Sequence, residues 1–228
     1  MSARQDPSGQ GMTSLRTRQR LVERLTEKGI SDVRVLEAMR DTPRHLFLDE
    51  ALSSRAYEDL ALPIGHQQTI SQPYTVARMT EAIIQNDRLS AKPIKHALEI
   101  GTGCGYQSAI LSRFSEKVIS LERVGPLHTK AKKTLKKLKI RNVDLVHDDG
   151  QSLLNSSKKF DAILSAAAPM SVPKYLYDAL EIGGRLIIPL GNDKKQQLTL
   201  ITRIDEETFK SDEIEDVLFV AHLGGLVE

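Results

Sequence analysis

From residue 93 onward, the sequence alternates between short apolar segments typical of buried strands and amphipathic segments typical of helices. Strand patterns cover residues 96–100, 117–121, 143–147, 161–165 and 185–190, and helical patterns cover residues 106–114, 126–138 and 173–180. Parallel strands need crossover connections, which are usually helices, so this alternation indicates a parallel sheet. Two later segments, 198–201 and 217–220, alternate like an antiparallel pair. The sequence therefore predicts an α/β fold with a Rossmann-like, doubly wound, mostly parallel central sheet and an antiparallel C-terminal pair.

An N-terminal helical extension is expected before this sheet. Apolar residues recur at helical spacing in two segments, after residues 15 and 32, and a third helix is expected to begin at Pro73. The apolar stripes are Leu21, Val22 and Leu25, then Val33, Leu36 and Met39, then Val76, Met79, Ala82 and Ile83. Residues 44–72 have no sustained period, so they predict an ordered loop that leads into the third helix.

The first 14 residues contain almost nothing to bury and predict a mobile leader. We therefore divide the chain into a leader, 1–14, and a single domain, 15–228. The domain combines N-terminal helices and a loop at 15–92 with a strand-rich core at 93–228. A chain of 228 residues that are 40% hydrophobic is long enough to bury one good core.

Composition excludes several classes of protein. Its 32 Lys and Arg against 30 Asp and Glu give a net charge of +2, far below that of a dedicated nucleic-acid-binding protein. The single Cys104 excludes an intrachain disulfide and a cysteine zinc cluster, and we expect no bound metal. No segment approaches the ~18 consecutive apolar residues of a membrane span, and the N-terminus lacks an apolar signal segment. A cytoplasmic protein is therefore expected.

Residues 98–106, LEIGTGCGY, lie where the first strand of the predicted sheet ends and a helix begins. Open α/β sheets bind ligands at this position, and glycines there let a ligand approach the main chain without a Cβ in the way. A dinucleotide site would need a third glycine at position 106, which is occupied by Tyr106. The spacing of Gly101, Gly103 and Gly105 therefore favours a nucleoside without phosphates.

Acidic side chains follow the next two strands at the same edge of the sheet. Glu122 lies 21 residues beyond Gly101, where a carboxylate can accept hydrogen bonds from both hydroxyls of a ribose. Asp149 and Gly150 follow the third strand, and an acidic side chain there could hold an adenine amino group. The alternative is that Glu122 and Asp149 only cap the helices that follow them.

The glycine segment followed by Glu122 resembles the cofactor motif of class I S-adenosylmethionine-dependent methyltransferases. Further segments narrow the resemblance to the protein-L-isoaspartate(D-aspartate) O-methyltransferase family: residues 62–74 (LPIGHQQTISQPY), 160–169 (FDAILSAAAP) and 183–191 (GGRLIIPLG). Asp148 stands where the family more often has Gly, and Cys104 stands where Ser is common. Residues 219–223 (FVAHL) also depart from the usual family ending, which leaves fine substrate preference open.

This resemblance implies a protein-repair enzyme. The family transfers a methyl group from S-adenosylmethionine to the carboxylate of L-isoaspartyl residues in damaged proteins, and the ester then closes to a succinimide that can reopen as normal aspartyl. Damaged proteins and peptides are the implied partners, without nucleic acid or membrane, and a monomer is expected. A carboxylate is ionised near pH 7 and is itself the nucleophile, so we expect no catalytic base.

The resemblance also assigns residues to the site. Ser71 falls on the active-site serine of the family, and its hydroxyl can donate to the carboxylate oxygen that does not attack. The alternative role is a helix cap, but with Pro73 first in the helix the cap position is Gln72. The implied cofactor-binding residues are Gln68, Thr69, Ile70, Ser71, Gly101, Gly103, Glu122, Asp149 and Gly150. His66, in the same loop, is expected to be structural.

Other functions remain open from the sequence. The lysines between residues 130 and 139 could contact the phosphates of an RNA, as in an RNA methyltransferase. Leu127, Ala131 and Leu135 share that segment at helical spacing and favour an ordinary surface helix. Residues 166–168 (AAA) offer no acceptor for an amino substrate, although they could equally pack at a tight strand end. A small-molecule methyltransferase and a catalytically silent relative that binds the cofactor are the remaining alternatives.

Overall fold

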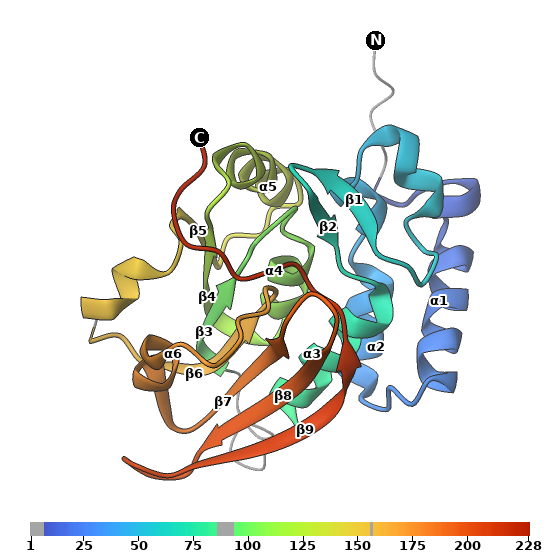
Figure 1. Cartoon of the computed structure of the whole chain (residues 1–228). Helices are drawn as coiled ribbons and strands as arrows, with labels where there is room; N and C mark the ends of the chain where they lie inside the picture. Colours follow the sequence, from blue (N-terminus) through green and yellow to red (C-terminus); the bar gives the residue numbers. More distant parts are fainter. Residues whose placement is uncertain (1–6, 86–93, 156) are drawn as a thin grey trace.

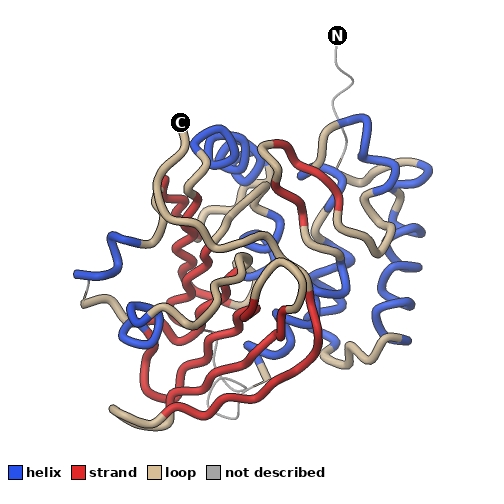
Figure 2. The backbone as a smooth tube through the Cα atoms, viewed as in Figure 1, coloured by secondary structure: helices blue, strands red, loops and turns tan. Residues whose placement is uncertain are grey.

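A computed structural model describes residues 7–85, 94–155 and 157–228 of the chain. Its centre is a sheet of strand order β5-β4-β3-β6-β7-β8-β9 (Figures 1 and 2). The strands are β3 Ile94–Ile100, β4 Ser115–Glu122, β5 Val143–His147, β6 Phe160–Ser165, β7 Leu180–Gly191, β8 Gln196–Arg203 and β9 Phe209–Val217. Strands β3 to β7 are parallel, and β8 runs antiparallel to both β7 and β9. The predicted doubly wound sheet with antiparallel C-terminal strands is therefore confirmed.

Helices cover both faces of this sheet. They are α1 Leu15–Glu27, α2 Val33–Asp41, α3 Pro73–Ile84, α4 Tyr106–Leu111, α5 Gly125–Lys137 and α6 Lys174–Ala179, with 3-10 turns η1 Gly11–Thr13, η2 Arg44–Phe47, η3 Glu50–Arg55 and η4 Gln151–Asn155. Neighbouring residues of β6 enter opposite cores, because side chains alternate along a strand. Ala162 and Leu164 join the core under α1 to α5, whereas Ile163 joins the core under α6.

The segment 44–72 was expected to be a loop, and this expectation is wrong in part. It contains η2, η3 and a hairpin of β1 Leu62–Gly65 and β2 Gln68–Ile70. Both strands are too short to show a period in the sequence. The hairpin turns through Gly65, His66 and Gln67, which all have positive φ angles. His66 thus lies in a turn, as its expected structural role suggests.

The last strand was also misplaced. An apolar pattern predicted a strand at 217–220, but β9 covers Phe209–Val217. Strand β9 is the edge of the sheet and has polar residues on both faces, a common property of edge strands, so it shows no apolar alternation. Residues 218–228, which we call the C-terminal segment, leave the sheet and run over the ends of the parallel strands (Figure 1).

The N-terminal helices begin where the sequence indicated. Ser14 and Asp32 occupy the N-caps of α1 and α2, and their side chains accept from the main-chain N–H groups of Thr17 and Arg34, respectively. The predicted stripe of α2 is partly wrong, since Val33 is 65% exposed and Val35 is buried instead. Val33 is the first residue of the helix, and its side chain lies beyond the surface that α1 and α3 cover. In α5, Leu127, Ala131 and Leu135 are buried, which confirms a surface helix with outward lysines.

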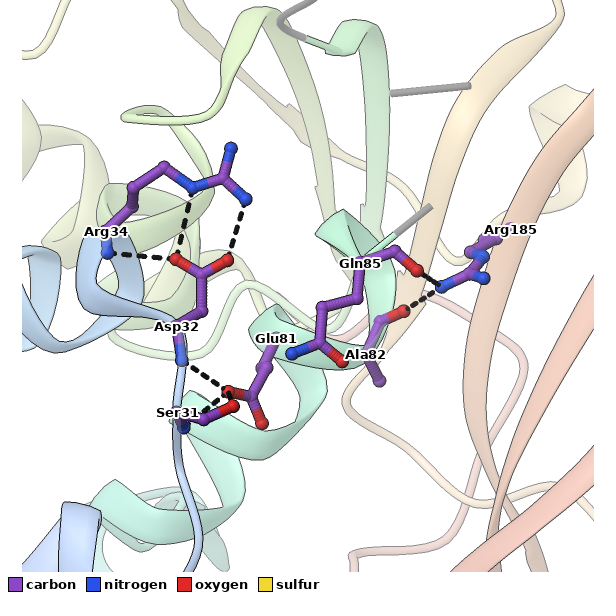
Figure 3. Close-up of polar contacts among 7 residues, drawn as sticks. All are labelled: Ser31, Asp32, Arg34, Glu81, Ala82, Gln85 and Arg185. Atoms are coloured by element: carbon purple, nitrogen blue, oxygen red, sulfur yellow. Dashed lines mark hydrogen bonds and ion pairs between the residues drawn. The ribbon is translucent and has the colours of Figure 1, made fainter. Parts of the chain in front are cut away.

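Helix α3 connects the helical extension to the sheet. The buried carboxylate of Glu81 accepts from the main-chain N–H groups of Ser31 (2.7 Å) and Asp32 (2.8 Å), ahead of α2 (Figure 3). At the end of α3, the guanidinium of Arg185 on β7 donates to the carbonyls of Ala82 and Gln85. These contacts fix the C-terminal half of α3 between the helical extension and the sheet.

The expected mobile leader lies partly outside the described residues, because residues 1–6 are not described. Within 7–14, η1 is closed by hydrogen bonds between Gln10 and Thr13, which leaves the predicted mobility untested. No helix among the described residues is long and apolar enough to cross a membrane.

Candidate active site

A cavity of about 550 Å³ opens at the carboxyl ends of β3, β4 and β6. Strand β3 is the point where the chain order reverses, since β4 and β5 extend on one side and β6 and β7 on the other. Ligands of open α/β sheets bind at such a switch point. The sequence-predicted residues that line the cavity are Gln68, Thr69, Ile70, Ser71, Gly101, Gly103, Glu122 and Asp149. Gly150 is the one predicted residue that does not line it, although it follows Asp149 directly.

The glycine loop, residues 101–105, forms the floor of the cavity. Gly101, Gly103 and Gly105 have φ angles of +87°, +56° and +89°, in the left-handed region that favours glycine. The N–H groups of Gly101 and Thr102 donate to the carbonyl of Leu121, which joins the loop to the end of β4. The loop is therefore held by the neighbouring strand and presents its main chain to the cavity.

Glu122 lies at the end of β4 and is 5% exposed. One carboxylate oxygen accepts from the Gly103 N–H at 2.7 Å, and the other accepts from the Val124 N–H at 2.9 Å. Each carboxylate oxygen has a second lone pair, so both can still accept from a ligand hydroxyl. The Val124 contact also makes Glu122 a support for the start of α5, as the capping interpretation expected, and the ribose contact stays a prediction.

A buried polar network lies under the glycine loop. The fully buried Glu99 on β3 accepts from the hydroxyls of Ser108 and Ser120, and Ser120 also contacts the Thr102 hydroxyl at 2.5 Å. Burial raises the pKa of Glu99 to about 7, although the two serine donors oppose the shift. No local sequence pattern indicated this network, because its members are scattered over β3, the glycine loop, α4 and β4.

The C-terminal segment covers the edge of the cavity. Ala168 and Ala221 form a bridge, and Val227 pairs with Val124 at the start of α5. Asp149 accepts from the N–H of Gly225 at 2.7 Å, a contact that lowers the pKa of its carboxyl group. The sequence indicated only that residues 219–223 were unusual, whereas residues 218–223 line the cavity. Of the small residues at 166–168, Ala166 and Ala167 line the cavity, and Ala168 pairs with the C-terminal segment.

His222 is the titratable residue of the C-terminal segment within the cavity wall. Its Nε2 lies 3.3 Å from the hydroxyl of Tyr175 on α6. Burial lowers the pKa of His222, so the imidazole is neutral at pH 7. Tyr175 in turn lies against Gly150, where a Cβ atom would stand 2.9 Å from its hydroxyl oxygen. Gly150 therefore shapes the turn beside the cavity without reaching it.

Ser71 lines the same cavity as the glycine loop and lies just before α3. It is half-buried, and its hydroxyl forms no hydrogen bond with a described residue. Gln72 occupies the N-cap position, as predicted, but the carboxylate that accepts from the helix N–H at Tyr74 belongs to Asp59 (2.8 Å). Ser71 therefore does not cap α3, and its hydroxyl is available to a ligand.

Two residues that the sequence did not single out close the cavity beyond Ser71. The Tyr74 hydroxyl donates to the carboxylate of Glu215 on β9 at 3.0 Å, and both side chains line the cavity. This hydrogen bond joins α3 to the edge strand β9, a contact that no local sequence pattern could reveal. No group of three or more His, Cys, Asp or Glu that could hold a metal ion occurs among the described residues.

Comparison with known proteins gives consistent results. The family model described as protein-L-isoaspartate(D-aspartate) O-methyltransferase matches residues 16–226. A protein-L-isoaspartate O-methyltransferase of Alcanivorax borkumensis is 50% identical over 96% of this chain and 97% of its own length. The enzyme of the same name from Pseudomonas paraeruginosa is 50% identical over 94% of this chain and 99% of its length.

Among solved structures, a similar chain comes from Plasmodium falciparum and is described as a protein-L-isoaspartate O-methyltransferase in complex with S-adenosyl-L-homocysteine. It superposes with a TM-score of 0.77 and 29% sequence identity, covering 90% of this chain and 98% of that one.

Proposed function

The chain belongs to the protein-L-isoaspartate(D-aspartate) O-methyltransferase family, and we propose that the cavity at the carboxyl ends of the parallel strands is its active site. Its activity is the S-adenosylmethionine-dependent methylation of L-isoaspartyl carboxylates in damaged proteins, a protein-repair reaction. One observation carries the proposal: the glycine loop, Glu122 and Ser71 line the same cavity.

The residues present fit S-adenosylmethionine. The cavity has the volume of a small-ligand site, and a Cβ at position 103 would stand 3.3 Å from Ile64, so a side chain there would narrow it. Glu122 would accept from the ribose hydroxyls, and Asp149 lies at the strand end where an adenine amino group would be held. The cofactor, when bound, supplies a methyl carbon attached to a positively charged sulfur.

Ser71 and its neighbours would hold the acceptor. We call residues 68–71 the acceptor loop. The Ser71 hydroxyl would donate to the carboxylate oxygen that does not attack, which leaves the other oxygen free as the nucleophile. Gln68, Thr69 and Ile70 line the same side and would contact both ligands. Ser71 orients the acceptor and does not itself form a bond to the methyl group.

The main contribution of the chain is alignment and exclusion of water. An ionised carboxylate needs no general base, so the chain has little proton chemistry to supply. Alignment of the carboxylate oxygen with the methyl carbon and the sulfur is worth on the order of 7–11 kcal/mol in favourable cases. Charge disappears as a carboxylate is methylated, and a cavity closed to water favours this loss of charge. The C-terminal segment, which covers the cavity edge, would provide this closure.

The direct test is methyl transfer from a labelled donor to an isoaspartyl peptide. We expect base-labile label on that peptide and none on the matched peptide with normal aspartate. Cofactor binding without transfer would identify a catalytically silent relative, and label on RNA or on a small molecule alone would identify a different methyltransferase.

Four further features belong to the proposal and rest on the sequence. We propose a leader at 1–14 with one methyltransferase domain at 15–228, a cytoplasmic location, a monomeric state and no nucleic-acid partner. Size-exclusion chromatography tests the monomer. Strongly salt-dependent binding of RNA would contradict the proposed lack of a nucleic-acid partner.

A further inference from the structure

Arg44 is a fully buried arginine at the start of η2, with 0% of its surface exposed. Its Nε donates to the carbonyl of Ala56 at 2.8 Å, and its Nη2 donates to the carbonyl of Ser71 at 2.7 Å. No carboxylate of a described residue forms an ion pair with this guanidinium. Its direct partners are therefore two main-chain carbonyls, one of which belongs to the acceptor loop.

The same guanidinium also contacts the cofactor side of the cavity. Its central carbon lies 4.8 Å from the ring centroid of Tyr106, in the geometry of a cation–π contact. Tyr106 is 1% exposed and begins α4 immediately after the glycine loop. Arg44 thus touches the acceptor loop with one edge and the first residue beyond the glycine loop with its flat face.

Burying Arg44 in this way lowers the stability of the fold, so stability does not explain the arrangement. A buried cation without a carboxylate partner loses its hydration, and main-chain carbonyls replace only part of it. A planar guanidinium can, however, fix two carbonyls and a ring at once, which a lysine cannot do. Asp59 accepts from the N–H of Tyr74, the second residue of α3, and from the side chains of Gln72 and Lys28, but it does not contact the Ser71 carbonyl. The carbonyl of Ser71 depends on Arg44.

Building on the proposed role of Ser71, we propose that Arg44 is a positioning residue, which sets the separation between the acceptor loop and the glycine loop. It touches neither ligand directly. It acts through Ser71, because a shift of the Ser71 main chain moves the hydroxyl that orients the acceptor. Misplacement by about 1 Å typically costs about 100-fold in turnover.

The test compares Arg44→Lys and Arg44→Ala with Arg18→Ala. Arg18 is a matched control, because it is also buried (3% exposed) and lies over a tyrosine ring, that of Tyr57, but has no contact with Ser71. We expect kcat to fall about 10-fold in Arg44→Lys and about 100-fold in Arg44→Ala, with the cofactor Kd changed less than about threefold. Arg18→Ala should lower the melting temperature and leave kcat within about twofold.

Two readouts distinguish positioning from general loss of structure. Millimolar guanidinium should restore part of the turnover of Arg44→Ala and none of the stability lost in Arg18→Ala. If Arg44→Ala does not fold, a double-mutant cycle of Arg44→Lys with Ser71→Ala distinguishes positioning from general loss of structure. Positioning through Ser71 predicts that Arg44→Lys costs less than about twofold in kcat once the Ser71 hydroxyl is absent.

Additive losses in the cycle, or equal losses of kcat in the Arg44 and Arg18 variants, would overturn the inference. Failure of the proposed function would look different, because the unmodified enzyme itself would then transfer no methyl group to the isoaspartyl peptide. Cofactor affinity, measured by calorimetry with S-adenosylhomocysteine, confirms in each variant that the glycine loop is intact.

Discussion

The two walls of the cavity are built in different ways. The cofactor wall, which is the glycine loop with Glu122, Asp148 and Asp149, consists of consecutive strand ends joined by main-chain hydrogen bonds and by the bond from the Gly103 N–H to the Glu122 carboxylate. The acceptor wall, which is the acceptor loop with residues 218–223, combines the short strand β2 with an irregular C-terminal segment. It is closed by contacts between residues far apart in sequence, such as Tyr74 and Glu215, which are separated by 141 residues. We infer that the cofactor wall sets affinity and the acceptor wall sets turnover. The predictions for Ser71, Glu122 and Asp149 test this division, and the prediction for Glu99 tests what supports the cofactor wall.

The largest expected effect is on the free energy of unfolding, and it comes from Glu99, which lies under the cofactor wall. In the folded protein its pKa is raised to about 7, above the unfolded value of 4.5, so the unfolded chain ionises first. Stability should therefore fall by up to roughly 3 kcal/mol as the pH rises from about 4.5 to 7, and then level off. Glu99→Gln should remove this part of the pH dependence, measured by urea unfolding at about pH 5 and pH 8.

Glu116→Gln is the control for this comparison, since Glu116 is exposed on the neighbouring strand β4. An unchanged pH dependence in Glu99→Gln would mean that Glu99 is ionised in the folded protein over the whole range.

On the acceptor wall, Ser71→Ala should lower kcat by about 100-fold and leave the cofactor Kd within about twofold. The reason is that a hydrogen bond to a charged oxygen is worth about 1.5–3 kcal/mol, and this hydroxyl contacts only the acceptor. Steady-state kinetics with an isoaspartyl peptide measure the change. Ser112→Ala serves as the control, because the Ser112 hydroxyl only donates to the carbonyl of Ala109. Equal losses in kcat and in cofactor affinity would assign Ser71 a structural role.

On the cofactor wall, Glu122→Ala should raise the cofactor Kd by roughly 10- to 30-fold, with little change in kcat at saturating cofactor. It should also destabilise the fold by about 1–2 kcal/mol, because the N–H groups of Gly103 and Val124 lose their acceptor. Calorimetry and urea unfolding give the two quantities separately. Glu116→Ala, an exposed residue near the start of the same strand, should change neither, and an unaltered Kd in Glu122→Ala would reject the assignment.

The smallest effect is expected where the two walls meet, at Asp149. Asp149→Ala removes the acceptor of the Gly225 N–H, so the C-terminal segment should exchange its amide hydrogens faster. We expect the cofactor Kd to rise only about threefold, since a largely exposed contact contributes about 0.5–1 kcal/mol. Asp144→Ala, an exposed carboxylate on β5, provides the comparison. Unchanged exchange at residues 224–228 would show that other contacts hold the segment.

The difference between the walls also explains what the sequence could predict. The positions of Glu122 and the glycine loop could be predicted from the ends of the strands, because all the parallel strands end at the same edge of the sheet. Pro73 predicted the start of α3 correctly, since its fixed φ suits the first helical position. In both cases the constraint acts over a few residues and is visible in the local pattern.

The rest could not be predicted because it depends on tertiary contacts. Nothing near Asp59 in the sequence indicates that it caps α3, and nothing near Arg44 indicates that it holds the carbonyl of Ser71. Strand β9 was missed because an edge strand needs no apolar face. The C-terminal segment has no period, and only its contacts with Ala168 and Asp149 show that it covers the cavity.

The hydrogen bonds of Asp149 have a consequence for the durability of the enzyme itself. An aspartate followed by glycine is a sequence where isoaspartate readily forms, because the glycine nitrogen can attack the side-chain carbon without hindrance from a Cβ. Here the carboxylate accepts from Gly225 and Gln151, which keeps it an anion and a poor electrophile, while the Gly150 N–H donates to Asp148 at 2.6 Å. The folded enzyme should thus resist, at its own binding site, the form of ageing that it reverses in other proteins.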